Sequence, residues 1–549
     1  MTGEAPADLV AAFEAYERAI LANDLDALDA AFAPGEGTLR GDAAGLLMGH
    51  DAISGFRSLR GGVAPRVITR LETRMLGADA ALLVSVSEYA AGGRGLQTQL
   101  WQRVDGRWRI TAAHVTGRAA AFDRSVWRSV GDPLYQGAYA GPLAGLGVAV
   151  KDLFAIAGYR IGAGNPTWLE QARPEAKTAA AVSDLLRGGA SIRGIARTDE
   201  FAYSIAGANA HYGTPPNGAA PGALPGGSSS GPATAVALGQ AEIGLATDTA
   251  GSIRVPASYQ GLWGLRTTHG LVPRQGLLPL AQSFDTVGWL TRDGATLERV
   301  AAWAIERHGA DASGESDVSG EPDSPSSDGD GGASTPAGLE GPRRWLVPAE
   351  ALDATEPATR AAFEAWLDRA VALGLVDEVE IRSVGDLAHL QETFRIVQAA
   401  EAWRNDGDWV SAHPGALGAD VAARFAAASE VTADAERAAR AELDVLRDCV
   451  RALVDDALVV LPTTPGPAPS RAGGGPGIEA TRTATLRMTT LAGIGGLPAL
   501  SAPFLMIDTP LGPAPVGVCF VGPPDRDVDL VRWALAIETA PGGASVASS

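Results

Sequence analysis

Apolar positions near the start of the chain follow first the period of a helix and then that of β-strands. Apolar residues of the first segment recur at spacings of four, three and four, which places them on one helical face; they are Leu9, Phe13, Tyr16 and Ile20. The residues that follow predict helices over Asp24–Phe32 and Asp51–Arg60 and strands over Arg66–Met75, Ala81–Tyr89, Gly95–Val104 and Trp108–His114, the last two joined by a hairpin turn at Asp105–Gly106. Helices followed by a curled antiparallel sheet indicate an α+β cone, so residues 1–122 are expected to form one domain.

The pattern changes from about Gly131, where glycine-rich turns alternate with helices and short apolar strands. This alternation is typical of an α/β architecture. The longer expected elements are helices over Thr178–Leu186, Glu356–Leu373, Ala433–Asp455 and Asp527–Glu538 and strands over Arg343–Val347 and Ala457–Leu461. Residues 123–540 are therefore expected to form a second, larger domain.

One segment interrupts that second domain. Residues 309–342 contain no Lys or Arg and are rich in Ser, Gly, Asp and Glu. Such a composition buries too little apolar surface to offset the entropy of ordering, which predicts a disordered acidic loop. A disordered tail is expected over residues 541–549.

The composition disfavours several classes of function. A net charge of −20 argues against binding to nucleic acid, because a phosphate backbone requires clustered cations. No apolar run approaches the ~20 residues of a membrane span, and the first residues lack the basic start and apolar stretch of a signal peptide, so we expect a cytoplasmic protein that binds no membrane. The two cysteines and seven histidines show no metal-ligand or redox spacing, so neither a metal nor another cofactor is expected.

Lysine is rare in this chain. Of the 44 Lys and Arg residues, only Lys151 and Lys177 are lysines. Arginine keeps its proton in proteins, whereas a desolvated lysine can lose it. Lys177 precedes an expected surface helix and needs no special role. Lys151 ends a short apolar strand, where a neutral amine could serve as a base.

Two loops of small residues follow along the chain. In the first, paired glycines give the backbone freedom to adopt an unusual conformation before Ser228. In the second, small residues precede Ser252, and a tight loop of this kind lets backbone N–H groups converge on one point as an oxyanion hole. The expected donors are the N–H groups of Thr249, Ala250, Gly251 and Ser252. No histidine lies nearby in the sequence, and lysine is the alternative base of Ser–Lys enzymes, so the loops indicate a serine nucleophile acting on an amide.

The segments that carry these residues resemble the amidase signature family. They read "LGVAVKDLF", "PGGSSSGPATAVALG" and "ATDTAGSIRVPASYQGLWGLRTT", with "TDEFAYSIAGANAHYGTPPN" after the first and "GLPALSAP" and "GVCFVGPP" near the end. The resemblance covers about residues 131–540 and implies an α/β fold with a central mixed β-sheet covered by helices. "SSSGP" replaces the usual SSGGS, and "DTAGS" replaces DTGGS; the form with Ala250 resembles the allophanate and carboxybiuret hydrolases of the family.

The resemblance also implies roles for individual residues. Ser252 would attack the substrate carbonyl and form an acyl-enzyme. Ser228, at a cis peptide, would relay the proton to Lys151 as the terminal base. The residues expected to support the relay or brace the nucleophile loop are Ser229, Asp248 and Arg254.

The N-terminal segment resembles the AtzH-like branch of the SnoaL-like or nuclear-transport-factor-like cones. The similar residues are "YERAILANDLDALDAAF", "LMGHDAISGFR" and "GRWRITAAHVT". The resemblance implies that Tyr16 and Arg40 hold a small carboxylated urea inside the cone. Alternatively, Tyr16 is ordinary core and Arg40 an exposed loop cation, or the domain serves dimerisation.

These features predict an amidohydrolase that cleaves a small amide or urea-type C–N bond, with a carboxylated urea or biuret suggested by the pairing of the two domains. A glutaminase-like subunit of an amidotransferase complex and a catalytically silent scaffold are the alternatives. The expected partner is a small-molecule amide, and a homodimer is expected. Candidate substrate-pocket residues are Tyr203, Arg395, Trp403 and Arg404.

Overall fold

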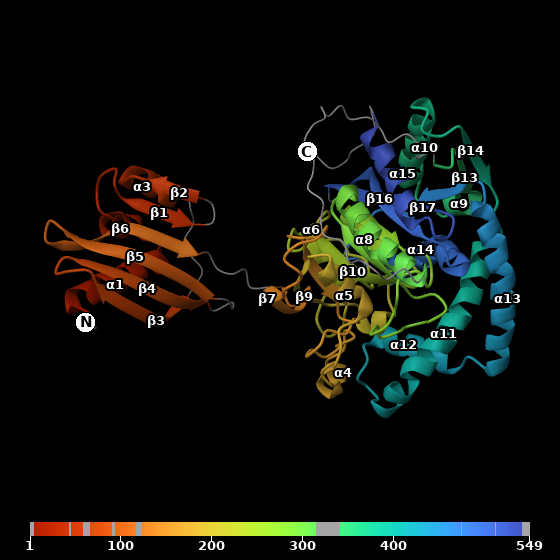
Figure 1. Ribbon diagram of the computed structural model, residues 1–549, viewed down its shortest axis with the longest axis horizontal. Coiled ribbons are helices and arrows are strands. Elements are labelled where there is room, and N and C mark those ends of the chain that lie inside the picture. The colour runs from red at the N-terminus through yellow and green to blue at the C-terminus, as the bar shows by residue number, and fades with distance from the viewer. Residues whose placement is uncertain are drawn as a thin grey trace. The chain divides into compact units, whose positions relative to one another are not determined.

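The structure is a computed structural model that describes residues 5–42, 45–58, 66–89, 94–116, 123–313, 341–473, 475–510 and 512–540. The chain divides into two compact units, Met1–Phe122 and Asp123–Ser549, each with a hydrophobic core of its own (Figure 1).

In the described residues of the N-terminal unit, six strands form one sheet in the order β2-β1-β6-β5-β4-β3, with three helices packed on it. The elements are α1 (Ala7–Ala22), α2 (Leu25–Ala31), β1 (Leu39–Asp42), β2 (Gly45–Met48), α3 (His50–Ser58), β3 (Arg66–Met75), β4 (Ala80–Tyr89), β5 (Arg94–Val104) and β6 (Arg107–Thr116). The predicted helices and the four long strands are confirmed to within two residues at each described end. The β1–β2 pair was not predicted; β1 runs parallel to β6 and extends the sheet beyond the antiparallel β3–β6 meander.

Local sequence explains the curled sheet. Asp105 and Gly106 both have positive φ, as the hairpin turn between β5 and β6 requires. The apolar face of α1 packs on residues of this sheet such as Trp101 and Ile110. The Tyr16 ring meets the Trp101 ring edge-on, with 6.2 Å between the ring centres. The alternation of buried and partly buried residues along β4 follows from one face covering this core.

In the described residues of the larger unit, eleven strands form one mixed sheet in the order β14-β13-β15-β17-β16-β11-β12-β10-β8-β9-β7. They are β7 (Trp127–Tyr135), β8 (Gly147–Lys151), β9 (Ser191–Ala196), β10 (Ile243–Asp248), β11 (Trp263–Arg266), β12 (Thr286–Thr291), β13 (Arg344–Pro348), β14 (Glu378–Arg382), β15 (Leu458–Pro462), β16 (Ala499–Thr509) and β17 (Gly512–Val521). β8 lies between β9 and β10, parallel to both, whereas β10 pairs antiparallel with β12. The predicted central mixed sheet covered by helices is confirmed.

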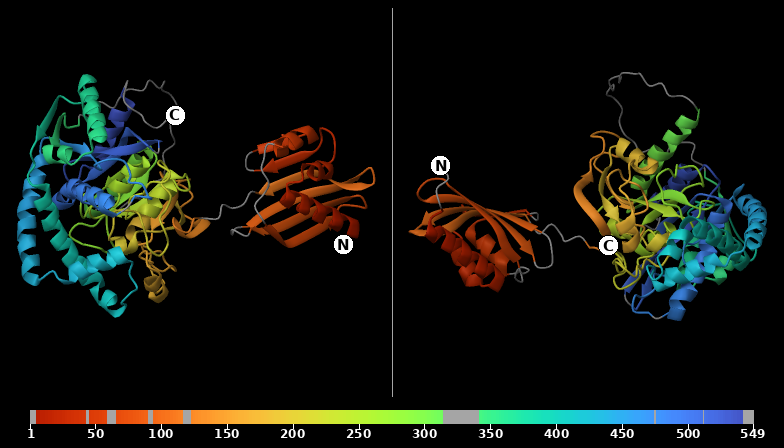
Figure 2. Two further views of the ribbon diagram at one scale, coloured as in Figure 1. Left: turned by 180° about the vertical axis from the view of Figure 1, so that it is seen from behind. Right: turned by 90° about the horizontal axis from the view of Figure 1, so that it is seen from below.

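The helices of this unit surround the sheet (Figures 1 and 2). They are α4 (Pro166–Gln171), α5 (Ala180–Arg187), α6 (Ser230–Ala237), α7 (Arg254–Gln260), α8 (Gly294–Ser313), α9 (Ala349–Asp353), α10 (Pro357–Ala372), α11 (Leu387–Ala412), α12 (Ala419–Ser429), α13 (Ala433–Arg451), α14 (Gly475–Gly495) and α15 (Asp527–Thr539). The predictions of α5, α10, α13 and α15 are confirmed, whereas α11, α12 and α14 were not predicted. Helices α12, α13 and α14 each pack against α11.

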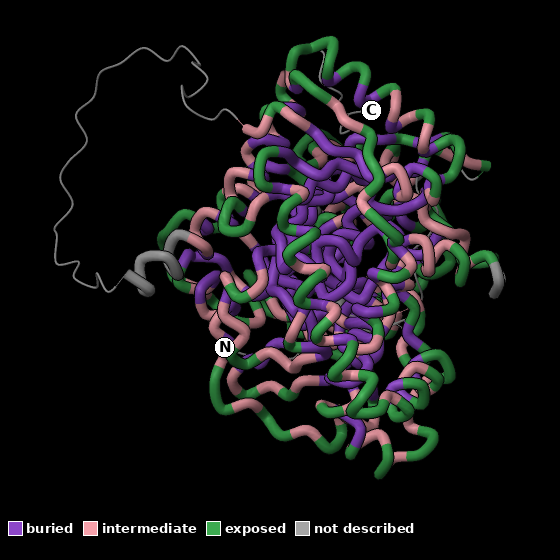
Figure 3. The backbone as a smooth tube through the Cα atoms, turned by 90° about the vertical axis from the view of Figure 1, so that its right-hand side faces the viewer, coloured by how far each residue is buried: buried purple, intermediate pink, exposed green. Residues whose placement is uncertain are grey.

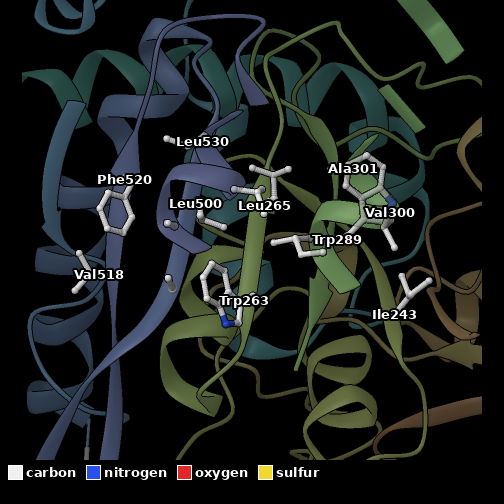
Figure 4. Packing of buried hydrophobic residues seen from close by; sticks show 14 of the residues in the cluster. Ile243, Trp263, Leu265, Trp289, Val300, Ala301, Leu500, Val518, Phe520 and Leu530 are labelled. Carbon is white, nitrogen blue, oxygen red and sulfur yellow. The ribbon is translucent and has the colours of Figure 1, made fainter. Parts of the chain in front are cut away.

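The core of the larger unit lies on the sheet. Figure 3 shows its buried segments gathered in the interior, and Figure 4 shows side chains of neighbouring strands in contact there. Trp263, Trp289 and Trp345 are fully buried among Val, Leu and Ile side chains. Strands that are buried along their whole length, such as β8 and β10, therefore have rigid surroundings at the ends from which the site residues project.

The predicted acidic loop and tail fall largely outside the described residues. Helix α8 continues to Ser313, five residues into the segment predicted as disordered, and residues 314–340 and 541–549 are not described.

Within the described ranges, no helix combines the length and apolar character needed to cross a membrane.

Candidate active site

Lys151 lies at the carboxyl end of β8 and is fully buried. Its Nζ atom is 2.8 Å from Ser228 Oγ, 2.9 Å from Ser229 Oγ and 2.8 Å from Thr247 Oγ1. Among the described residues, no carboxylate comes within ion-pair distance of this amine. Burial lowers the pKa of Lys151 to about 7, although the charges of more distant carboxylates oppose the shift. A substantial fraction of this lysine is therefore neutral near neutral pH.

The loop that carries Ser228 approaches neighbouring backbone and side chains very closely. A Cβ atom on Gly227 would lie 2.3 Å from Asp199 Oδ2, so a side chain cannot be accommodated there. The peptide bond between Gly227 and Ser228 is cis. The Ser228 carbonyl accepts hydrogen bonds from the Asp199 N–H at 3.1 Å and from Thr198 Oγ1 at 2.9 Å. These contacts hold Ser228 immediately before α6.

Asp248 organises the loop between β10 and α7. Its carboxylate accepts a hydrogen bond from the Gly251 N–H at 2.8 Å and two from the Arg254 guanidinium at 3.0 and 2.9 Å. Arg266 Nη1 lies 3.2 Å from the same carboxylate. Burial opposes ionisation, but the two guanidinium groups outweigh it and lower the pKa of Asp248. Asp248 is thus a buried anion that fixes the loop, and Gly251 meets this geometry with a φ of 122°.

Two further contacts hold the loop from outside. Thr249 Oγ1 donates to Asp285 at 2.6 Å, and Thr489 of α14 donates to the Ala250 carbonyl at 2.6 Å. The Gly251 N–H, one of the four predicted oxyanion donors, is already bonded to Asp248, whereas the N–H groups of Ala250 and Ser252 have no protein partner among the described residues.

The three predicted catalytic residues come together because their segments are neighbours in the fold. β8 and β10 are adjacent parallel strands, so Lys151 and the loop carrying Ser252 lie at the same edge of the sheet. The Ser229 N–H donates to the Ser252 carbonyl at 3.3 Å, which joins the two serine loops. Within the described residues, no hydrogen bond links the Ser252 and Ser228 hydroxyls directly. Ser229 Oγ also lies 2.9 Å from Lys151 Nζ, and its supporting role stays a prediction.

Ser252 lines a small pocket of about 40 Å³, together with residues of the 202–205 turn and of α11 and α14. A larger vestibule of about 390 Å³ lies next to it, and both cavities are lined by Tyr203, Gln398, Arg482 and Leu486. The vestibule therefore adjoins the small pocket at Ser252.

The four candidate pocket residues divide evenly. Tyr203 and Arg395 line the vestibule. Arg404 instead pairs with Glu436 at 2.8 Å on the exposed side of α11. Trp403 is partly buried and packs against Gly407 beside the core. The vestibule residues Arg424 and Arg482, on α12 and α14, were missed, because those helices were not predicted.

The site has partners that the motifs alone did not reveal. Thr247, one residue before Asp248, contacts Lys151, and its position on the same strand could have indicated this contact. Asp285 and Thr489 lie far away in the sequence, and nothing in their surroundings indicated a role at the nucleophile loop.

In the N-terminal unit, Tyr16 is buried and its hydroxyl lies 3.3 Å from Arg57 Nη2. Arg57, which sequence reasoning missed, also lies over the Phe32 ring at 4.4 Å. Arg40 is buried too, with its guanidinium 4.5 Å from the centre of the Phe56 ring. The cation in contact with Tyr16 is therefore Arg57 rather than Arg40.

In the described part of the chain, no three His, Cys, Asp or Glu side chains are grouped as metal ligands.

Comparison with known proteins places both units. The amidase family model matches residues 132–531, and a model described as AtzH-like matches residues 2–120. Amidase 1 of Arabidopsis thaliana is 34% identical over 385 residues, which are 66% of this chain and 86% of the relative. The 2-amino-5-chloromuconic acid deaminase of Comamonas testosteroni is 34% identical over 438 residues, which are 76% and 86% of the two chains.

A solved structure shows the same relationship. It comes from a vestigial protein complex described as revealing the evolutionary origins of an s-triazine catabolic enzyme, and it matches with a TM-score of 0.62 and 28% identity over 73% of this chain and 84% of that chain. The chain therefore belongs to the amidase family, carries an AtzH-like domain at its N-terminus, and is a hydrolase that acts on carbon–nitrogen bonds.

Proposed function

We propose that the larger unit hydrolyses a small amide or urea-type bond with Ser252 as nucleophile, Ser228 as proton relay and Lys151 as base. The observation that carries this proposal is the surroundings of Lys151: a fully buried amine, 2.8 Å from Ser228 Oγ, whose hydrogen-bond partners among the described residues are all hydroxyl groups. An amine paired with a carboxylate would stay protonated, whereas this one can accept a proton.

The reaction runs in two halves. Ser252 Oγ forms a bond to the carbonyl carbon while its proton passes to Ser228, whose own proton passes to Lys151 Nζ. The C–N bond then breaks, and the proton returns along the same relay to the leaving nitrogen, which departs as ammonia or an amine. In the second half, water gives a proton to the relay while its oxygen attacks the acyl carbon. The bond between that carbon and Ser252 Oγ then breaks, the acid product leaves, and the proton returns from the relay to restore the Ser252 hydroxyl.

The negative charge that develops on the carbonyl oxygen needs hydrogen-bond donors at the Ser252 loop. The N–H groups of Thr249, Ala250 and Ser252 are suited to this role, because the Gly251 N–H is engaged by Asp248. Gly251 then serves as the link between Asp248 and the loop. Asp248 and Arg254 hold the donors in place before substrate binds, so no reorganisation is needed during reaction.

The substrate we propose is a carboxylated urea or biuret. Support comes from the AtzH-like domain, from the similarity to a deaminase of a muconic acid, and from the similarity to a protein connected with s-triazine catabolism. In the N-terminal unit, Tyr16 with Arg57 and Arg40 would hold such a molecule through its carboxylate. A cytoplasmic location and a homodimeric state of this protein stay predictions.

Ammonia release from a panel of primary amides, ureas, biuret and glutamine tests the proposal. The purified chain should release ammonia from at least one small urea or amide, and Ser252→Ala should abolish the release. Ser183→Ala on α5, outside both cavities, is the matched control. Turnover of glutamine alone would favour the glutaminase-like alternative, and no turnover of any member would favour a silent scaffold.

A further inference from the structure

Three guanidinium groups line the vestibule next to Ser252, although the chain as a whole has a net charge of −20. They come from three helices that pack together: Arg395 from α11, Arg424 from α12 and Arg482 from α14. Two carboxylates, Asp420 and Glu479, line the same cavity. The hydrogen bonds of each arginine decide which of them remain available to a ligand.

The three arginines differ in this respect. Arg395 is neutralised by Glu392, to which it donates two hydrogen bonds of 2.7 and 2.6 Å. Arg482 donates one hydrogen bond to Glu479 at 2.8 Å, through Nη1. Arg424 donates to the carbonyl oxygen of Tyr203 at 2.8 Å and forms no ion pair with any described residue. Most N–H groups of Arg424, and Nη2 of Arg482, therefore have no protein partner in the described part of the chain.

Arg424 and Arg482 are close enough to repel each other. Burial lowers the pKa of Arg424, and the charge of Arg482 adds to this shift. Both cations also act on the phenol of Tyr203, whose pKa is nevertheless raised by burial, so its hydroxyl stays a hydrogen-bond donor at neutral pH. Two half-buried cations beside a neutral donor are stabilised by an anion between them, and a carboxylate matches the planar geometry of guanidinium groups.

We propose that Arg424, Arg482 and Tyr203 form a subsite for a carboxylate of the substrate. The inference rests on the proposed function. Since Tyr203 and Arg482 line both cavities, the carboxylate lies in the vestibule while the opposite end of the molecule reaches the small pocket at Ser252. The small pocket, of about 40 Å³, fits a terminal carboxamide, so the preferred substrate is a short molecule with a carboxamide at one end and a carboxylate at the other.

Two matched pairs of compounds test the subsite: malonamate against malonamide and succinamate against succinamide. Within each pair the shape is nearly the same and only the charge differs. The parent should show at least about a hundredfold higher kcat/KM for one acid than for its diamide. Arg424→Gln and Arg482→Gln should each lower kcat/KM for that acid by about thirtyfold, mainly through KM, and change the diamide less than about threefold.

Arg404→Gln is the matched control, because Arg404 lies outside both cavities. This variant should leave kcat/KM for the acid and for the diamide unchanged. Arg482→Lys should recover part of the lost preference, since charge is retained but the planar fork is not. Equal losses for acid and diamide in the Gln variants, or a parent that prefers the diamide, would overturn the subsite.

A binding experiment separates this inference from the proposed mechanism. In the Ser252→Ala background, calorimetry should detect binding of the acid, and adding Arg482→Gln should remove it. Binding without any hydrolysis by the parent would retain the subsite and reject the proposed function. Absence of binding for both acids would reject the subsite even if neutral amides are hydrolysed.

Discussion

Lys151 in the larger unit and Arg57 in the N-terminal unit are both cationic side chains that contact uncharged groups. Lys151 is fully buried, whereas Arg57 is half-buried and lines a cavity of about 230 Å³ together with Asp26 and Asp29. Lys151 is surrounded by three hydroxyls, and Arg57 by the Tyr16 hydroxyl, the Leu28 carbonyl and the Phe32 ring. Neither forms an ion pair with a described residue. The difference is chemical: a buried lysine can give up its charge, whereas an arginine cannot. Lys151 is thus suited to proton transfer, whereas Arg57 offers a fixed positive charge to an anion in a cavity that two carboxylates also line.

Exchange of the two cation types gives the largest expected effect. Lys151→Arg should lower kcat/KM by more than about a thousandfold, because guanidinium cannot accept the proton from Ser228. Arg57→Lys should change amide hydrolysis less than about threefold. Ammonia release measures both, with circular dichroism to confirm folding. A well-folded Lys151→Arg enzyme with more than about a tenth of parent activity would show that Lys151 is not the base.

The ion pairs of Asp248 in the larger unit and Glu17 in the N-terminal unit should contribute differently to stability. Asp248→Asn leaves Arg254 and Arg266 buried without their shared anion, and should lower the free energy of unfolding by about 3–5 kcal/mol. Among the described residues, Glu17 pairs with one guanidinium, that of Arg66 at 2.7 Å, so Glu17→Gln should lower the free energy of unfolding by less. Urea denaturation followed by circular dichroism compares the variants. Equal losses would mean that the second guanidinium on Asp248 adds nothing.

The pH dependence should also separate the two cations. With a pKa of about 7, Lys151 is mostly protonated at pH 6 and mostly neutral at pH 8, so kcat/KM should rise about tenfold between them. Binding of an anion at Arg57 should not follow this rise, because Lys151 belongs to the other unit. Rate profiles and calorimetry of the Ser252→Ala protein give the two curves. A flat or falling rate profile would contradict a neutral Lys151.

The N-terminal unit has its own core and is expected to fold alone. Residues 1–122 expressed separately should bind malonate, and Tyr16→Phe, Arg57→Gln and Arg40→Ala should each weaken binding by about five- to tenfold. Arg74→Gln, an exposed residue of β3, is the control. Unchanged binding in all three variants would favour the dimerisation role, which sedimentation can measure.

The smallest effect is expected away from both cations. Replacing residues 314–340 by a short Gly/Ser linker should change kcat/KM and Tm little, because this composition offers few apolar side chains for packing. Loss of more than about half the activity would show that the segment contacts the site.

The elements and loops that could be predicted are those that a short stretch of sequence marks by itself. Strands β3 to β6 contain stretches in which apolar and polar residues alternate. The loops of Ser228 and Ser252 carry small residues in a recognisable order. Helix α11 was missed because it buries residues around most of its circumference, Glu401 and Asp406 included, so no single apolar stripe marks it.

Contacts between distant segments that no motif marks could not be predicted. Arg57 lies in a helix that was expected, but spacing alone does not tell which side of that helix meets Tyr16. Arg424 and Arg482 likewise meet only when α12 and α14 pack on α11. The buried position of Lys151 could be predicted, because the chain has so few lysines and this one ends an apolar strand.

That scarcity has a practical consequence for labelling the protein. Amine-reactive esters modify accessible amines, and of the two lysines Lys177 is exposed whereas Lys151 is fully buried. Apart from the α-amino terminus, a fluorophore or surface linker will therefore attach at one defined position, on the segment before α5, and leave the proposed base unmodified. Slow loss of activity on prolonged exposure to a small acylating reagent would then report how often the interior around Lys151 opens to solvent.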